Sequence, residues 1–272
     1  DNGSVDDTRA AAEQFFRDRW EDGRVLVEER RSISHARNLA LREAVAPVVA
    51  FIDDDELADP NWLSALRSAW ANADARVAGI GGPMRADWQA QRPAWLEDHL
   101  LFVVSVLDLG PVRKKLDQKG GTGYLWGGNM SFRRSAALAV GGFQPDQVYL
   151  SAVANAPNRA RPRLSTARSG EEQRLQDRLT AEGWEIWYDP AVAIDHLISP
   201  ERTTRRFFSD FYRQRAILAL GSGRSRGTAL PILAREASRY VLFQRLGRPR
   251  ATSAAVGLAG AWTLLIRPRP PA

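Results

Sequence analysis

The segment Phe51-Ile52-Asp53-Asp54-Asp55-Glu56 decides how the rest of the chain is interpreted. It closes an apolar run, Val48 to Ile52, that predicts a buried strand, and three aspartates follow where this strand should end. Unpaired buried carboxylates repel one another and are costly to desolvate. Their oxygens are ligands that Mg²⁺ and Mn²⁺ prefer, and open α/β sheets bind ligands at the carboxyl ends of strands. The segment therefore predicts a metal-assisted site for a phosphate-bearing substrate.

An acidic turn is the alternative interpretation of the same residues. Asp59-Pro60 lies just downstream, and an aspartate N-cap followed by proline at the first helical position starts a helix. Because an isolated Asp-x-Asp pair has a high false-positive rate, the metal hypothesis depends on other parts of the chain.

Composition limits the class of protein. The chain has 272 residues, of which 44% are hydrophobic, enough for one large domain with or without an appendage. It contains no cysteine, so disulfides and thiolate metal sites are excluded. A net charge of +6 suits anionic partners such as nucleotide sugars, phospholipid surfaces or nucleic acid.

No signal peptide is visible at the start of the chain. The first residues, Asp1-Asn2-Gly3-Ser4, form a turn sequence of the kind that follows a strand, so we expect a preceding strand and helix to be missing.

Apolar periodicity predicts alternating strands and helices, and hence a largely parallel sheet flanked by helices. Residues 87–123 are expected to be partly helical with a mobile loop, and residues 144–168 form a long polar loop. The expected strands are 24–28, 48–52, 76–82, 131–132, 185–188 and 191–195, the last followed directly by His196. The expected helices are 9–20, 34–45, 61–73, 133–140, 203–220, and one that Gly170 begins and Gly183 ends.

The last part of the chain, residues 223–272, is basic and apolar. Its uncharged run Ala251–Ile266 has 16 residues, fewer than the ~20 that a membrane-spanning helix needs. Arginines flank this run, so an amphipathic helix lying on an anionic membrane surface fits better than a span. A helix packed on the preceding domain, or a self-association surface, is the alternative.

Four further motifs accompany the aspartates in order along the chain. They are Asp1-Asn2-Gly3-Ser4, Ser34-His35-Ala36-Arg37-Asn38, Trp126-Gly127-Gly128-Asn129-Met130, and Gly170-Glu171-Glu172 with Leu175 and Gly183 after it. Together the five resemble family 2 glycosyltransferases of the GT-A fold, over roughly residues 1–215. The resemblance implies a Rossmann-like α/β domain in residues 1–222, with a mixed, mostly parallel sheet and without its first strand, and a helical appendage in residues 223–272.

The resemblance also implies a nucleotide-diphosphate sugar as donor and Mg²⁺ or Mn²⁺ as cofactor. Donor binding would fall to Asp1, Arg37, Asn38, Asp53, Asp54, Arg205 and Arg206. Metal ligation would fall to Asp53, Asp55 and His196. Plainer interpretations remain open: a turn aspartate at position 1, an Arg37 that only pairs with an acid, and a structural histidine. Arg202, Arg205 and Arg206 either hold the diphosphate, form a solvated helix face or contact lipid headgroups.

The acceptor side of the site is implied by the other two motifs. Trp126, Gly127, Gly128 and Asn129 would form a loop whose glycines let the backbone approach a sugar, with a tight turn as the alternative. Glu172, beside Glu171, would take the proton from the acceptor hydroxyl, and the helix N-terminus there favours the ionised form. The family has Glu-Asp at these positions, so Glu172 reaches one methylene further. Ordinary helix-start acids are the alternative.

We therefore expect an inverting glycosyltransferase that moves a sugar, from a UDP-sugar first of all, to a hydroxyl acceptor on a polysaccharide or glycolipid. It would be cytoplasmic and peripheral on the inner face of the cell membrane, without a nucleic-acid partner. A catalytically inactive sugar-nucleotide binder is the main alternative. A nucleic-acid-binding protein is disfavoured because no basic and aromatic single-strand motif appears. A nucleotidyltransferase would need a glycine-rich phosphate loop ahead of residue 1.

Overall fold

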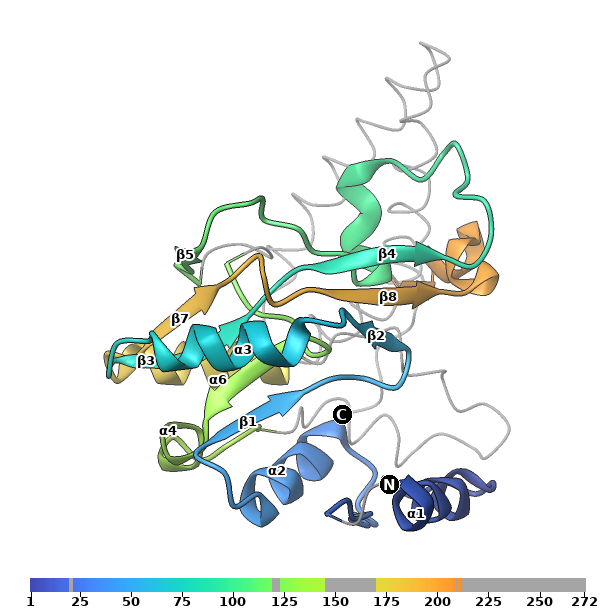
Figure 1. Ribbon diagram of the computed structural model, residues 1–272. Helices are drawn as coiled ribbons and strands as arrows, with labels where there is room; N and C mark the ends of the chain where they lie inside the picture. The colour runs from blue at the N-terminus through green and yellow to red at the C-terminus, as the bar shows by residue number, and fades with distance from the viewer. Residues whose placement is uncertain (20–21, 119–122, 145–169, 209, 212–272) are drawn as a thin grey trace, which may run out of the picture.

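The fold is built on a five-stranded sheet that continues into a smaller three-stranded sheet (Figure 1). A computed structural model describes residues 1–19, 22–118, 123–144, 170–208 and 210–211. The strands are β1 Val48–Phe51, β2 Glu56–Ala58, β3 Val77–Gly81, β4 Met84–Trp88, β5 Lys114–Lys115, β6 Met130–Arg133, β7 Glu185–Tyr188 and β8 Ile194–Ile198. The helices are α1 Thr8–Arg19, α2 Ile33–Glu43, α3 Trp62–Ala71, α4 Arg134–Ala139 and α6 Glu171–Ala181, with 3-10 turns η1 Asp98–Val104 and η3 Pro200–Thr203.

The larger sheet has the strand order β1-β6-β3-β7-β5 and is mixed in direction. Strand β3 pairs in parallel with β7, whereas β6 lies between β1 and β3 and is antiparallel to both. Strands β1, β3 and β7 therefore run the same way, as the β/α alternation predicts. The mixed α/β class is confirmed. The expectation of mostly parallel pairing is wrong, because β6 separates β1 from β3 and β5 adds a further antiparallel edge.

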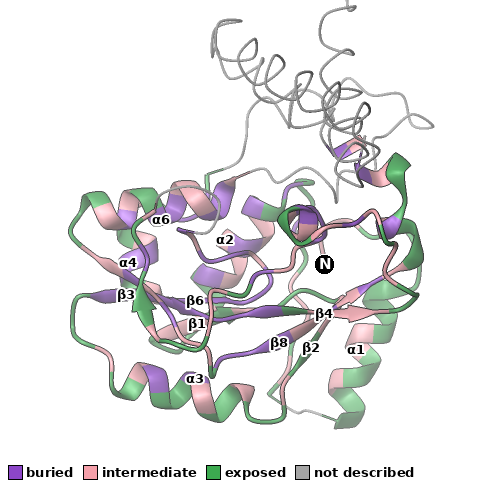
Figure 2. Ribbon diagram, turned by 90° about the horizontal axis from the view of Figure 1, so that it is seen from above, coloured by how far each residue is buried: buried purple, intermediate pink, exposed green. Residues whose placement is uncertain are grey.

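Helices cover both faces of the larger sheet (Figure 2). Helices α2, α4 and α6 pack together on one face, where Leu41, Phe132, Leu175 and Tyr188 belong to one buried cluster. Helix α3 covers the other face and packs Leu66 and Ala69 against Val77, Ile80 and Val192. Strand β7 serves both layers, since Ile186 and Tyr188 enter the first cluster and Trp187 packs against the second. This period-2 alternation is what a strand buried on both faces requires.

The smaller sheet continues the larger one. The chain passes from β1 into β2, from β3 into β4 and from β7 into β8, and the smaller sheet has the order β2-β8-β4. Strand β2 is antiparallel to β8, with Glu56 opposite His196. Because the aspartates lie on the β1–β2 connection, this pairing brings residues 53–56 beside a strand that follows them by about 140 positions in sequence.

Several elements differ from expectation. Strands β2, β4 and β5 were not expected. Strands β2 and β5 have only three and two residues, β4 is interrupted by Arg85 and Asp87, and all three pair with strands distant in sequence. Residues 24–28 form no strand, although Asp1 supplies backbone partners to Leu26 and Glu28. Strand β8 begins at Ile194, so His196 lies inside it rather than after it. Three predicted segments lie outside the residues that the structure describes: the appendage 223–272, loop residues 145–168 and helix residues 212–220.

None of the helices in the described ranges has the length and apolar character needed to cross a bilayer.

A buried glutamine on α6 joins that helix to the loop before β6. Gln176 is fully buried, and its Oε1 accepts a hydrogen bond from Leu125 N at 2.8 Å. Its Nε2 donates to Leu125 O at 2.9 Å and to Glu172 O at 3.0 Å. Since buried polar groups must be paired, this side chain fixes the loop relative to the first turn of α6.

We expect Gln176→Leu to lower the free energy of unfolding by about 2–4 kcal/mol, because the buried N–H and C=O of Leu125 lose their partner. Urea unfolding followed by far-UV circular dichroism measures the change. Gln173→Leu, at a partly exposed position on the same helix, is the matched control and should cost less than about 0.5 kcal/mol. Equal losses in the two variants would contradict the anchoring role.

Candidate functional site

Three carboxylates meet on the β1–β2 connection. Oxygen atoms of Asp53, Asp55 and Glu56 all lie within 4.8 Å of one another. Glu56 turns back over the loop, and its Oε2 accepts a hydrogen bond from Asp53 N at 3.0 Å. Asp54 is exposed and is not part of this group. The predicted acidic site therefore contains Glu56 in place of Asp54, which sequence inspection missed because the loop conformation decides which of four consecutive acids converge.

The crowding of these carboxylates perturbs their protonation. Burial raises the pKa of Glu56 to about 8, and the charges of Asp53 and Asp55 add to that effect. Burial also raises the pKa of Asp53, although Arg37 opposes the shift. The contact with His196, and then the positive charge of Arg202, lower the pKa of Asp55. Ionisation of all three carboxylates is therefore disfavoured unless further positive charge is added, and a bound cation would add it.

His196 and Arg202 face Asp55 from β8 and η3. His196 is buried, and its Nε2 lies 3.4 Å from Asp55 Oδ2. Arg202 Nη2 donates to the same Oδ2 at 2.6 Å, and its Nη1 lies 2.7 Å from His196 Nε2. The structure therefore brings two of the predicted metal ligands, Asp55 and His196, together with an arginine that bridges them.

Arg37 joins the acidic cluster to the first turn of α6. Its side chain is only 7% exposed, and the guanidinium lies over the rings of Phe51 and Phe143. Nη1 donates to Glu171 Oε1 at 2.8 Å, and Nη2 lies 3.5 Å from Asp53 Oδ1. Both hydrogen-bonding edges of the Arg37 guanidinium therefore face acids of this chain.

The acid pair on α6 is buried. Glu171 and Glu172 are 4% and 6% exposed, on a helix that begins after Gly170 in the left-handed conformation. Burial, and then the charge of Glu172, raise the pKa of Glu171, while Arg37 opposes the shift. Glu171 Oε2 has no hydrogen-bond partner. The ion pair with Arg37 therefore engages Glu171 of the two acids.

The Trp126–Asn129 loop is largely buried and supports the side chains of the acidic site. Trp126 packs in a cluster with Met84, Leu107 and Ile194. Asn129 donates to the carbonyls of Pro83 and Val192 and accepts from Trp62 Nε1. A Cβ at Gly127 would lie 2.6 Å from Arg37 Nη2, and one at Gly128 would lie 1.7 Å from Glu56 Oε1. The two glycines therefore make room for the side chains of the acidic site, a role that spacing alone does not reveal.

The remaining predicted donor residues lie in separate places. Asn38 exchanges two hydrogen bonds of 2.7 Å with the backbone of Phe143, so its amide links α2 to the segment after α4. Asp1 Oδ1 accepts from Ser4 N, and Asp1 lines a hollow of about 330 Å³ beside α1 and α2. Arg205 lies over Trp95, and Arg206 is 93% exposed near Asp210. It is Arg202 that reaches the acidic cluster.

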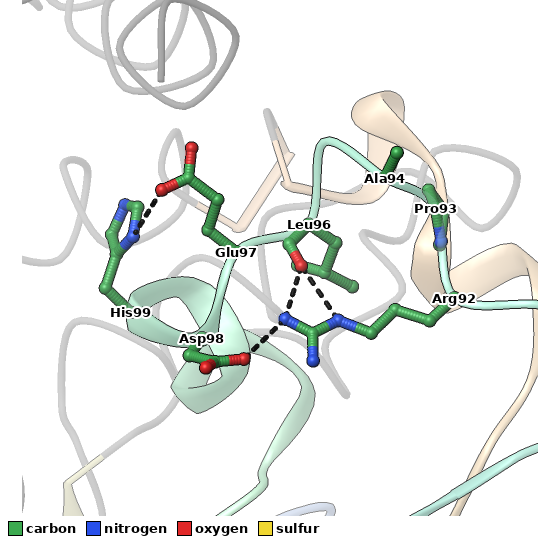
Figure 3. Close-up of a pocket in the computed structure, with 7 residues that line it drawn as sticks. All are labelled: Arg92, Pro93, Ala94, Leu96, Glu97, Asp98 and His99. Carbon is green, nitrogen blue, oxygen red and sulfur yellow. Dashed lines mark hydrogen bonds and ion pairs between the residues drawn. The ribbon is translucent and has the colours of Figure 1, made fainter. Parts of the chain in front are cut away.

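A second hollow, of about 570 Å³, lies around the start of η1 (Figure 3). Arg92 donates there to the carbonyl of Leu96 and to Asp98, and His99 Nδ1 lies 3.5 Å from Glu97. It shares no lining residue with the acidic cluster. Its charged groups contact one another.

The acidic cluster fits a hard divalent cation. Three carboxylates supply oxygen ligands and His196 supplies an imidazole nitrogen, a donor set that suits Mn²⁺ or Mg²⁺. The cationic guanidinium of Arg202 already contacts Asp55 Oδ2 and His196 Nε2, so a positive group lies against both atoms.

Comparison with known proteins identifies the family. The profile of "Glycosyl transferase family 2" matches residues 1–141, just over half of the chain. This chain belongs to glycosyl transferase family 2. A solved mannosyltransferase from Pyrobaculum calidifontis, in complex with GDP-Man and Mn²⁺, superimposes with a TM-score of 0.57 at 15% identity, over 98% of this chain and 76% of that one. The fold of this family 2 member is therefore GT-A, as the motifs predict.

Two curated relatives match part of this chain. A glucosyl-dolichyl phosphate glucuronosyltransferase of Haloferax volcanii is 32% identical over 116 residues, which is 43% of this chain and 36% of the relative. The succinoglycan biosynthesis protein ExoM of Rhizobium meliloti is 32% identical over 111 residues, 40% of this chain and 32% of the relative. The match thus spans about a third of the length of each relative.

We expect Gly128→Ala to weaken Mn²⁺ binding about tenfold, or ~1.4 kcal/mol, because the new methyl group displaces the Glu56 carboxylate from the cluster. Isothermal titration calorimetry measures the affinity. In a Glu56→Ala background the same substitution should have no further effect, since the atom that it meets is gone. A tenfold loss in both backgrounds would contradict the steric explanation.

Proposed function

We propose that this chain is the catalytic part of an inverting glycosyltransferase that uses a nucleotide-diphosphate sugar and Mn²⁺ or Mg²⁺. The observation that carries the proposal is the Arg37 guanidinium, which contacts Asp53 on one side and Glu171 on the other. It links the acidic cluster and the Glu171–Glu172 pair within one site, as a transferase that binds a donor diphosphate and deprotonates an acceptor requires. Family membership supports the reaction class.

The donor diphosphate would bind at the acidic cluster. Asp53, Asp55, Glu56 and His196 would hold the divalent cation, whose charge neutralises the diphosphate as it departs. Arg37 keeps Asp53 in position, and the Trp126–Asn129 loop keeps Arg37 and Glu56 in position. GDP-Man and Mn²⁺ bound to the mannosyltransferase that shares the fold are consistent with such a donor.

Glu172 would act as the general base. It takes the proton of the acceptor hydroxyl as that oxygen forms a bond to the anomeric carbon. The bond from that carbon to the diphosphate oxygen breaks, and its electron pair leaves with the nucleotide diphosphate. One displacement inverts the anomeric configuration. The acceptor is proposed to be a hydroxyl of a lipid-linked or polysaccharide glycan, in line with the names of the two curated relatives.

We expect Mn²⁺ together with one class of nucleotide sugar to raise the melting temperature by about 5 °C or more at saturating ligand, and Asp55→Asn to abolish that rise. A thermal-shift screen of UDP- and GDP-sugars, with and without Mn²⁺, measures the effect. Asp74→Asn, an exposed aspartate away from the site, is the control and should behave like the wild type. Equal shifts in the Asp55→Asn variant would remove Asp55 from the site.

We expect Glu172→Gln to retain donor binding and to lower the transfer rate roughly 10²–10⁴-fold, the usual contribution of a general base. Donor affinity comes from the thermal shift, and transfer from release of nucleotide diphosphate with the acceptor present. Glu182→Gln, at the exposed end of the same helix, controls for loss of a carboxylate on α6. Full turnover by Glu172→Gln would assign the base to another residue, and no transfer by the wild type with any acceptor would favour a binding protein.

A further inference from the structure

Arg202 contacts the two atoms through which Asp55 and His196 would bind a cation. Its Nη2 donates to Asp55 Oδ2 at 2.6 Å, and its Nη1 lies 2.7 Å from His196 Nε2. An arginine guanidinium carries only donors, so a hydrogen bond from Arg202 requires the tautomer in which His196 Nε2 is the acceptor. The two predicted ligands are thereby held close, with Oδ2 and Nε2 3.4 Å apart.

The guanidinium and a divalent cation need the same lone pairs. A coordinated Mg²⁺ lies about 2.1 Å from its ligand atoms. Asp55 Oδ2 and His196 Nε2 cannot direct these lone pairs at a cation while Arg202 lies at hydrogen-bond distance from both. Two positive groups would also repel each other at that separation.

The surroundings of Arg202 let its side chain leave while its backbone stays. The 3-10 turn η3 is fixed by a hydrogen bond from Arg202 N to Ser199 O and by Thr203 Oγ1 donating to Pro200 O. The Arg202 side chain, however, is 25% exposed, so it has a path to solvent. Arg37, the other arginine at the cluster, is 7% exposed and is also engaged with Glu171 and with the carbonyl of Gly127.

We propose that Arg202 is a positioning residue that competes with the divalent cation. It holds Asp55 and His196 in a ligand-like arrangement when no cation is bound, and it must rotate away for the cation to bind. The inference rests on the proposed function, because it assumes that these two residues ligate the metal. Arg202 is then a counter-ion that belongs to the chain itself, and the ease with which its side chain leaves Asp55 and His196 sets the metal affinity.

The test is the Mn²⁺ affinity of the nucleotide-free protein, measured by isothermal titration calorimetry and by electron paramagnetic resonance of free Mn²⁺. Arg202→Met removes the guanidinium and keeps an unbranched side chain, so we expect Mn²⁺ to bind about tenfold more tightly. Arg206→Met, at a 93% exposed arginine four residues further on, should bind within about twofold of the wild type and controls for the loss of one positive charge. Arg202→Lys keeps the charge but cannot bridge both atoms, so its affinity should fall between those of the wild type and Arg202→Met.

The outcomes separate this inference from the proposed function. Unchanged or weaker binding by Arg202→Met, with the wild type binding Mn²⁺, would overturn the competition and leave the metal site standing. Equal affinities of Arg202→Lys and the wild type would show that the charge at position 202, rather than the bridge, sets the affinity, which also overturns it. Absence of Mn²⁺ binding in the wild type and in every variant would refute both the proposed metal site and this inference.

Discussion

Electrostatic repulsion among carboxylates at the β1–β2 connection is the constraint on which the site depends. Asp53, Asp55 and Glu56 converge within 4.8 Å, and like charges at that separation resist ionisation unless positive charge offsets them. Arg37 and Arg202 supply that charge from two elements distant in sequence, α2 and η3. The fold thus carries its own cations at the position where a divalent ion is proposed to bind.

The site is held by buried polar side chains as well as by the apolar core. Asn129 and Gln176 are almost fully buried and bind backbone groups of other segments, so the loop before β6 is fixed both to β3–β4 and to α6. Such residues stabilise less per group than apolar packing, but leaving their partners unpaired is costly. They therefore specify one loop arrangement, and that arrangement leaves space for Arg37 and Glu56 beside Gly127 and Gly128.

Periodicity in the sequence was enough to locate the longer elements, including β1, β7 and the start of α6, because apolar residues recur at strand or helix spacing there. It could not find β2 or β5, whose three and two residues are strands only because β8 and β7 pair with them. Among the site residues, the aspartates and His196 are visible as an acid cluster and a histidine near a strand end. The burial of Arg37 and the contact of Glu56 with the cluster depend on long-range geometry. A linear motif therefore predicted that Arg37 binds the donor, and it did not identify Glu56 as a site residue.

The antiparallel register of β2 and β8 also limits how this part of the chain can vary. Glu56 lies opposite His196 in a pairing only three residues long. Since neighbouring strand positions face opposite sides of a sheet, a shift of one residue would turn His196 away from Asp55. Substitutions on the outer face of β2 leave this relation intact, whereas a single inserted or deleted residue between Asp55 and Ala58 would separate the imidazole from the carboxylates. The site therefore depends more on the length of this short segment than on the side chains of its outer face.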